Sequence, residues 1–508
     1  MDVVLHRGDI VERTAGALAL GVLEDERPLA GVAAAADRAS RGAIKAVLER
    51  GDFRGRFLES VTLYPPAISA ARLILVGLGR RADLTEHRVR QAAGAAARKA
   101  RELAAGTLAT TVPARAGLDP ARAAQAVAEG VVLGSYRFTA YRGEGQGRPL
   151  KRVEILERDA GLARSLAPAV ARGAAWASAT CLARDLASTP GQDLTPEMLA
   201  ERAREIAGKA GARIEVLGVP ELEALGMGAL LAVGRGSVHP PRFLVLEREP
   251  PAPRRRGARA ETVVLIGKGV TFDTGGISLK PRENMHKMKY DMSGAAAVLA
   301  TFAALPTIEP AARIVGLIPA AENMPGGRAL KPGDVLRALD GTRIEVTNTD
   351  AEGRLLLADA LGYARRLKPG VVVDLATLTG AVSIALGHLA AGLFTDDDAL
   401  AGELLEASAA TGERLWRLPI WDEFADDLKS DTADLVNSSS REGGASLGAV
   451  FLKRFARGLT WAHLDIASTA WSPADRPLEP RGATGFGVRL LLEWLSRRTA
   501  AAPDAPQA

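Results

Sequence analysis

The sequence has almost no cysteine and little histidine. Cys181 is the single cysteine among 508 residues, and histidine occurs six times. No disulfide can form within the chain, which excludes a secreted disulfide scaffold and favours a reducing cytoplasm. Cysteine-ligated zinc or iron–sulfur sites and the H-E-x-x-H pattern are excluded as well. A metal bound to this chain would therefore be held mostly by carboxylates.

The charge and the hydropathy of the chain are ordinary for a globular protein. Hydrophobic residues make up 47%, and 65 basic residues against 60 acidic ones give a net charge of +5. The densest basic run, Arg254–Arg256, is flanked by prolines and predicts a loop rather than a nucleic-acid patch. The chain opens without a basic region, and the apolar stretch Ala15–Leu23 is short. We therefore expect no signal peptide, no membrane span and a cytoplasmic location.

Alternating apolar runs and helical patterns predict an α/β fold with two domains. In the first third, strands at Val61–Pro65, Leu73–Gly79 and Val153–Glu157 alternate with helices at Leu84–Leu103 and Ala121–Val132. This pattern predicts a smaller N-terminal α/β domain. The predicted boundaries are an N-terminal domain at 1–168, a connecting helix at 169–190, a catalytic domain at 191–499 and a disordered tail at 500–508.

Strands and helices also alternate in the larger, C-terminal domain, which predicts a doubly wound, mostly parallel sheet. The predicted strands are Phe243–Leu246, Thr262–Ile266, Arg313–Leu317, Arg343–Thr347 and Val371–Leu375. The predicted helices are Ser293–Ala304, Gly353–Arg366 and Ala381–Leu386. In sheets of this kind the site lies at the carboxyl ends of the strands.

Charged residues are concentrated in three segments that follow or precede these elements. The acidic ones are Asp273, Asp291, Asp350 and Glu352, and the basic ones are Lys268, Lys280 and Arg354. Four carboxylates in one crevice repel each other strongly unless cations compensate them. Two divalent ions would balance the charge, and oxygen ligands favour Mn²⁺, Mg²⁺ or Zn²⁺. Two such ions can share a water and lower its pKa enough to form hydroxide near neutral pH.

A simpler interpretation is that Asp291 and Asp350 only cap helices and that the glycines only turn the chain. That interpretation is preferable for any one residue taken alone. It is disfavoured for seven charged residues that converge on one crevice.

Three segments resemble the leucine aminopeptidase (cytosol aminopeptidase) family of two-metal exopeptidases. They are GKGVTFDTGGISLKP at 267–281, MKYDMSGAAAV at 288–298 and NTDAEGRL at 348–355. The last is the signature octapeptide of the family and matches without a substitution. Further matches at 184–186, 321–325, 374–380 and 463–467 extend the resemblance over the larger domain. The first third is similar to the family's N-terminal domain only in length and α/β character.

The resemblance implies a role for each matching residue. One metal would be held by Asp273, Asp350 and Glu352, and the other by Lys268, Asp273, Asp291 and Glu352. Lys280 would act as the electrophile that stabilises the oxyanion, and Arg354 would hold a bicarbonate ion that accepts the proton of the attacking water. The pocket for the substrate side chain would be formed by Met288, Thr377, Gly380 and Ala467.

The resemblance thus predicts a metal-dependent leucyl aminopeptidase. It would remove N-terminal, preferably Leu-like, residues from peptides by attack of a metal-bridging hydroxide. Two divalent ions are expected per subunit, Mn²⁺ in the first place, with Zn²⁺ or Mg²⁺ as alternatives. The family also implies a homohexamer that is not bound to a membrane.

Two other functions were weighed against this one. A two-metal phosphoesterase would use similar chemistry, but the missing histidine ligands and the family motifs argue against it. A DNA-binding role of the N-terminal domain, as in some family members, is disfavoured because no DNA-reading motif is present. A serine nucleophile at Ser446, in a G-x-S-x-G pattern, is rejected because a polar run and no strand precedes it.

Overall fold

The computed structural model describes residues 1–113, 117–143, 149–251, 260–440 and 442–501. The chain divides into two compact units: unit 1 is Met1–Cys181 with Ala474–Arg481, and unit 2 is Leu182–Pro473 with Gly482–Ala508. The predicted tail at 502–508 and the basic run Arg254–Arg256 lie outside the described residues. None of the helices that the structure describes combines the length and apolar character needed to span a bilayer.

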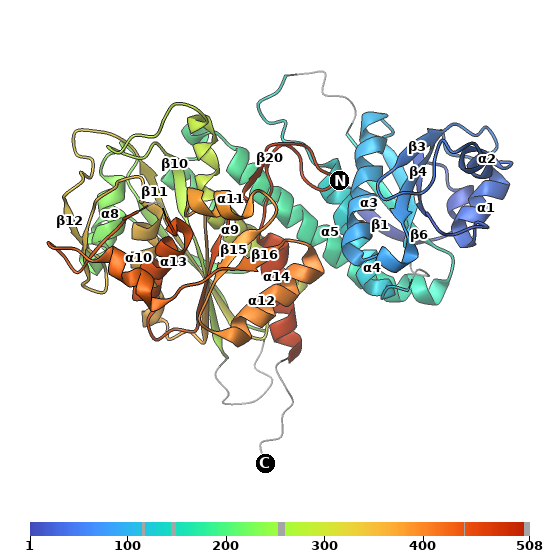
Figure 1. Cartoon of the computed structure of the whole chain (residues 1–508). Coiled ribbons are helices and arrows are strands. Elements are labelled where there is room, and N and C mark those ends of the chain that lie inside the picture. The colour runs from blue at the N-terminus through green and yellow to red at the C-terminus, as the bar shows by residue number, and fades with distance from the viewer. Residues whose placement is uncertain (114–116, 144–148, 252–259, 441, 502–508) are drawn as a thin grey trace, which may run out of the picture. The chain divides into compact units, whose positions relative to one another are not determined.

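Unit 1 is built on a sheet with the strand order β1-β6-β5-β2-β4-β3, parallel except for β3. Its strands are β1 (Asp2–Arg7), β2 (Ala17–Leu23), β3 (Ser60–Leu63), β4 (Leu73–Gly79), β5 (Thr107–Thr111) and β6 (Arg152–Glu157). Its helices are α1 (Gly31–Ala39), α2 (Ala43–Arg50), α3 (Glu86–Glu102) and α4 (Pro120–Ser135), followed by α5 (Ala160–Ser188). Helices α3 and α4 cover one face of the sheet and α1 and α2 the other (Figure 1).

Helix α5 differs from the predicted connecting helix. It starts at Ala160 rather than at residue 169, and the division between the units falls inside it, after Cys181. The hydrophobic residues of α5 lie on several sides of the helix. The sequence therefore shows no helical periodicity from which its first residue could be predicted. The segment Ala474–Arg481 belongs to unit 1, where Leu478 joins the core beneath α3 and α4. Nothing in the local sequence of this segment indicated that it would leave unit 2.

Unit 2 contains a larger mixed sheet whose centre is parallel. Its strand order is β16-β15-β18-β14-β9-β11-β8-β7, with β10 added beside β11. These strands are β7 (Arg213–Leu217), β8 (Arg242–Arg248), β9 (Thr262–Gly267), β10 (Gly269–Asp273), β11 (Arg313–Asn323), β14 (Val371–Ala376), β15 (Ala391–Phe394), β16 (Leu415–Arg417) and β18 (Trp461–Asp465). The central strands β9 and β14 are buried along their whole length because helices cover both faces. The predicted α/β class with mostly parallel sheets in two domains is confirmed.

The helices of unit 2 surround this sheet and leave the carboxyl ends of its central strands to the connecting segments (Figure 1). They are α6 (Pro196–Ala210), α7 (Val219–Leu225), α8 (Gly228–Gly234), α9 (Ser293–Ala304), α10 (Gly353–Arg366), α11 (Gly380–Leu386), α12 (Asp398–Thr411), α13 (Gly444–Ala456) and α14 (Val488–Ala501). The last two residues of α14, 500 and 501, were predicted to belong to the disordered tail. They are helical in the structure.

One predicted strand of the main sheet lies elsewhere. Residues Arg343–Thr347 were expected in the central sheet, but β13 spans only Arg343–Glu345 and pairs with β12 (Val335–Arg337) and β17 (Leu435–Val436). Only Ile344 is buried in this strand, so it lacks the two apolar faces that a central strand needs. A further small ribbon joins β19 (Trp471–Ser472) to β20 (Gly482–Ala483).

The core of unit 1 includes one buried ion pair whose loss has a predictable effect. Arg90 Nε lies 2.5 Å from Glu129 Oε2, and the two side chains are 5% and 1% exposed. We predict that Glu129→Ala lowers the free energy of unfolding of this unit by about 3–5 kcal/mol, because it buries the Arg90 guanidinium without that carboxylate. Chemical denaturation followed by circular dichroism measures the change.

The exposed pair Lys45–Glu49 serves as the control, since its side chains are 68% and 65% exposed. Glu49→Ala should cost less than about 1 kcal/mol. If both variants lowered the free energy of unfolding by the same amount, the buried pair would not be a particular determinant of stability.

Candidate metal centre

Glycines bring the ends of β9, α9 and β14 into close contact. A Cβ at Gly294, in the first turn of α9, would lie 2.1 Å from Leu375 O and 2.9 Å from Lys268 N. A Cβ at Gly353, where α10 begins, would lie 2.7 Å from Lys268 Nζ. Both distances are too short for a side chain, so glycine is needed at each position. Backbone atoms of Leu375 and Lys268 lie against Gly294, and the Lys268 side chain lies against Gly353.

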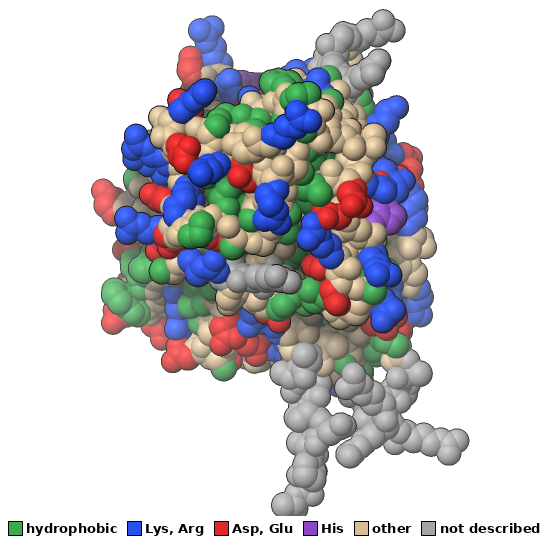
Figure 2. Space-filling view, turned by 90° about the vertical axis from the view of Figure 1, so that its right-hand side faces the viewer, with side chains coloured by type: hydrophobic (Ala, Val, Ile, Leu, Met, Phe, Trp, Pro, Cys, Tyr) green, Lys and Arg blue, Asp and Glu red, His purple; other side chains and the backbone are tan. Residues whose placement is uncertain are grey.

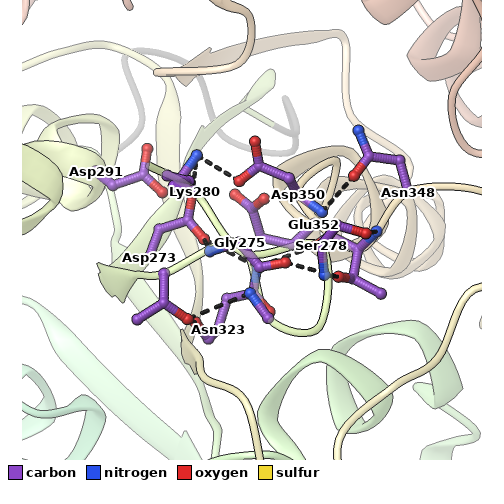
Figure 3. Close-up of polar contacts among 12 residues, drawn as sticks. Asp273, Gly275, Ser278, Lys280, Asp291, Asn323, Asn348, Asp350 and Glu352 are labelled. Atoms are coloured by element: carbon purple, nitrogen blue, oxygen red, sulfur yellow. Dashed lines mark hydrogen bonds and ion pairs between the residues drawn. The ribbon is translucent and has the colours of Figure 1, made fainter. Parts of the chain in front are cut away.

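The four predicted acidic residues converge at the carboxyl end of the sheet. Asp273 ends β10, Asp291 lies in the 3₁₀ helix Met285–Met292, and Asp350 and Glu352 lie between β13 and α10. One carboxylate oxygen from each of Asp273, Asp350 and Glu352 lies within 4.8 Å of the others. Figure 3 shows these side chains pointing toward one another from separate segments of the chain. The predicted grouping of acidic residues is therefore present in the fold.

Two lysines connect the carboxylates in pairs. Lys268 Nζ lies 2.9 Å from Asp291 Oδ1 and 2.7 Å from Glu352 Oε1. Lys280 Nζ lies 2.7 Å from Asp273 Oδ2 and 2.5 Å from Asp350 Oδ1. The two ammonium groups compensate two of the four carboxylate charges, and the buried guanidinium of Arg354, which interacts with Glu352, adds a third positive charge against the four. The site thus retains an excess of negative charge in a place that is largely screened from water.

The pKa values report this electrostatic situation. Burial, together with the charge of Glu352, raises the pKa of Asp273 to about 6. Burial also raises the pKa of Asp291 well above its usual value. For Lys268, burial lowers the pKa, but the nearby carboxylates outweigh burial and hold it above the ordinary lysine value. The same balance applies to Lys280. At Glu352, by contrast, the two lysines outweigh burial and lower the pKa. A cation would therefore compete with protons mainly at Asp273 and Asp291.

The guanidinium of Arg354 forms the other side of the site. It is buried in the first turn of α10, and its Nη1 donates a hydrogen bond to Asn437 O at 2.7 Å. Burial lowers the pKa of Arg354 to about 10, although Glu352 and Asp465 act in the opposite direction. Its Nε is buried and has no acceptor within the described part of the chain. A buried donor of this kind suits a small anion.

Of the four residues predicted for the substrate pocket, Thr377 contacts the charged cluster directly. Thr377 follows β14 and touches two of the charged residues: its carbonyl accepts from Lys268 Nζ at 2.9 Å, and its hydroxyl donates to Asp291 Oδ1 at 2.6 Å. Met288 lies in the same 3₁₀ helix as Asp291, and Gly380 starts α11. The fourth residue is Ala467, which follows β18.

Sequence reasoning missed three buried polar residues that support the site. They are Asn323, Asn437 and Asp465. Asn323, at the end of the apolar strand β11, donates to Asp273 Oδ1 at 2.9 Å and to Thr349 O at 3.0 Å. Its signal in the sequence was an amide at the end of an otherwise apolar strand.

Asn437 holds the segment that carries Asp350 and Glu352. Its side-chain oxygen accepts from the backbone N–H of Thr347 at 2.9 Å, and its Nδ2 donates to Asn348 O at 2.7 Å. Its own carbonyl accepts the hydrogen bond from Arg354. The side chain is fully buried, so these bonds are made without competition from water. Asn437 is distant in sequence from every motif, and no pattern indicated its position.

Several reactive side chains of the chain have no part in the site. His286 is exposed, while His463 is buried in the sheet, where its Nδ1 lies 2.5 Å from Asp374 Oδ1. Ser446 lies within α13, and no strand immediately precedes it among the described residues. Cys181 packs at the margin of the core of unit 1.

Comparison with known proteins agrees with this geometry. Residues 181–492 match the catalytic domain of the cytosol aminopeptidase family, and residues 19–145 match its N-terminal domain. A "Probable cytosol aminopeptidase" of Geobacter sp. (strain M21) is 45% identical over 500 residues, which cover 98% of this chain and all of the relative. One from Roseiflexus castenholzii is 44% identical and covers 97% of this chain and 99% of the relative.

Solved structures show the same fold. The bottromycin maturation enzyme BotP, in a complex with Mn, has a TM-score of 0.85 and 42% identity, over 96% of this chain and all of the other. A mutant of tomato leucine aminopeptidase has a TM-score of 0.87 and 34% identity, over 98% of this chain and 96% of the other.

Fold, site and relatives define a metal-dependent peptide hydrolase with two α/β domains. The chain belongs to the cytosol aminopeptidase family. It is a metal-dependent aminopeptidase that acts on peptides.

The hydrogen bonds of Asn437 lead to a first functional prediction. Asn437→Ala should lower kcat/KM for an aminoacyl anilide by about 10–100-fold, because the segment carrying Asp350 and Glu352 loses its support. Steady-state kinetics measure the effect. Asn437→Asp retains an acceptor for Thr347 N–H but not the donor to Asn348, so it should fall between the wild type and the alanine variant. Wild-type kinetics for both variants would exclude a role of this side chain.

Proposed function

We propose that this aminopeptidase removes N-terminal residues, preferentially Leu-like ones, from peptides with two divalent ions held by the carboxylate cluster. The observation that carries the proposal is the convergence of four carboxylates, three of them buried, whose negative charge exceeds that of the two lysines and of Arg354. One ion would bind Asp273, Asp350 and Glu352, and the other Lys268, Asp273, Asp291 and Glu352.

The residues present fit such ions. Asp291 Oδ2 is buried and has no hydrogen-bond partner among the described residues, which leaves a ligand atom free. Three further oxygens lie within 4.8 Å of one another, close enough to share an ion. All ligands except Lys268 are oxygens, which supports Mn²⁺, with Zn²⁺ and Mg²⁺ as alternatives. The Mn complex of BotP, a related structure, supports the same choice.

Each charged group outside the ligand set would have its own task. When bound, the two ions would supply the Lewis acidity that activates water and the scissile carbonyl. Lys280, whose side chain is 22% exposed, would donate to the carbonyl oxygen as negative charge develops there. Arg354 would hold a bicarbonate ion through its buried Nε, and the bound ion would supply the base that the reaction needs. Lys268 would have to be neutral to act as a ligand.

The preference for Leu-like residues rests on the side chains next to the metal ligands. Met288, Thr377, Gly380 and Ala467 would form the walls of the side-chain pocket. The name of the tomato relative, a leucine aminopeptidase, supports this preference. The free α-amine of the peptide would bind a metal, which restricts cleavage to the N-terminal residue.

The names of the relatives support a location for this chain. Their name places them in the cytosol, and we infer the same for this chain. The homohexamer expected from the family remains a prediction, which mass photometry can test. Nucleic acid is not expected as a partner. In agreement with this prediction, Figure 2 shows basic and acidic side chains interspersed on one face of the molecule.

Metal removal tests the proposed function directly. A chelated, metal-free sample should lose cleavage of leucyl anilide by at least about 100-fold, and Mn²⁺ should restore it. Metal analysis of the restored enzyme should give two ions per chain. Full activity of the metal-free sample would refute the proposal, and cleavage of an aryl phosphate instead of the anilide would favour a phosphoesterase.

Lys280 provides a second test. Lys280→Ala should lower kcat by about 10²–10³-fold without loss of Mn²⁺, because a donor to the developing oxyanion is removed. The matched control is Lys331→Ala, since Lys331 is exposed and pairs only with Asp334 at 3.4 Å among the contacts described. An unchanged kcat for Lys280→Ala would remove this residue from the mechanism.

A further inference from the structure

Asp465 is a buried carboxylate that does not belong to the proposed ligand set. It ends β18, and its relative exposure is 0%. Its Oδ1 accepts from the backbone N–H of Leu378 at 3.1 Å and of Ala467 at 3.2 Å. Its Oδ2 accepts from the N–H of Thr379 at 3.1 Å and from the Thr379 hydroxyl at 2.7 Å. Both oxygens are thus used to hold the segment 377–379 against β18.

The same segment touches two proposed metal ligands on its other side. The Thr377 carbonyl accepts from Lys268 Nζ, and the Thr377 hydroxyl donates to Asp291 Oδ1. A neutral lysine amine has two N–H bonds and one lone pair. Fixing one N–H on a carbonyl therefore limits the directions in which the lone pair can point. Occupying Asp291 Oδ1 likewise leaves the buried Oδ2 as the oxygen available to a cation.

We propose that Asp465 is a positioning residue: by fixing the segment 377–379, it orients Lys268 and Asp291 and so sets the metal affinity of the site. The inference rests on the proposed function, because it assumes that these two residues bind an ion. Partners of metal ligands that make no metal contact typically contribute 10–100-fold to affinity. Asp465 does not touch Lys268 or Asp291 itself. Its effect on them would pass through the backbone of residues 377–379.

The test is the affinity of the full-length protein for Mn²⁺, measured by competition with a fluorescent chelator. Asp465→Asn keeps the size of the side chain but turns one acceptor into a donor that faces N–H groups. We expect the dissociation constant for the ion that Lys268 and Asp291 would bind to rise by about 10–100-fold. Excess Mn²⁺ should then restore most of the kcat, which it should not do for Lys280→Ala.

Asp359→Asn is the matched control. Asp359 is also a fully buried carboxylate of unit 2, and it accepts from the backbone N–H of Leu230 at 2.9 Å and of Leu339 at 2.8 Å. It contacts none of the proposed ligands in the bonds described. This variant should bind Mn²⁺ within about twofold of the wild type, because its loss affects packing around α8 and not the segment 377–379.

A double-mutant cycle with Thr377→Val decides whether Asp465 acts through this segment. If it does, the two substitutions share one path, and their combined effect on the dissociation constant should be smaller than the product of the single effects. An unchanged affinity in Asp465→Asn, or fully multiplicative effects, would overturn the inference. If Asp465→Asn does not fold, Thr379→Val, which removes one of the four bonds to Asp465, takes its place in the cycle. A wild type that binds no Mn²⁺ would refute the proposed function itself.

Discussion

Electrostatic repulsion between buried carboxylates is the constraint on which the rest of this structure depends. Asp273, Asp291 and Glu352 are nearly inaccessible to water, so their charges are poorly screened. The protein supplies two lysines and the guanidinium of Arg354, which together leave part of the negative charge uncompensated. Such an arrangement is costly for folding unless a cation or protons complete it. Without a bound cation, burial and this repulsion raise the pKa values of Asp273 and Asp291.

The parallel centre of the unit 2 sheet makes this arrangement possible. Strands β9, β14 and β18 run in the same direction, so the segments that follow them meet at one edge. Lys268, Thr377 and Ala467 follow these strands, and glycine at 294 and 353 lets the helices approach closely enough to complete the site. A side chain at either glycine would displace Lys268 or the end of β14. The motif glycines are therefore a steric requirement of the charged cluster.

The charged residues, and most of the helices and strands that carry them, could be predicted from the sequence. Strand β4 and helices α9 and α10 have the predicted bounds, because β4 and α9 are almost continuous apolar runs and α10 has an apolar face. The placement of β13 in a separate small sheet could not be predicted, because a three-residue strand has no period. The start of α5 was predicted too late for a similar reason, since that helix has no single apolar face.

The supporting residues were missed for a different physical reason. Local patterns report on periods and caps, whereas Asn437 and Asp465 act across the fold, on segments about 90 residues away in sequence. Each satisfies several backbone groups of an irregular segment that has no helix or sheet partners of its own. Irregular segments are needed at the site because they let backbone and side chains from several strands meet. A carboxylate-based metal centre in such a sheet thus requires buried polar side chains from later in the chain, and only the folded structure identifies them.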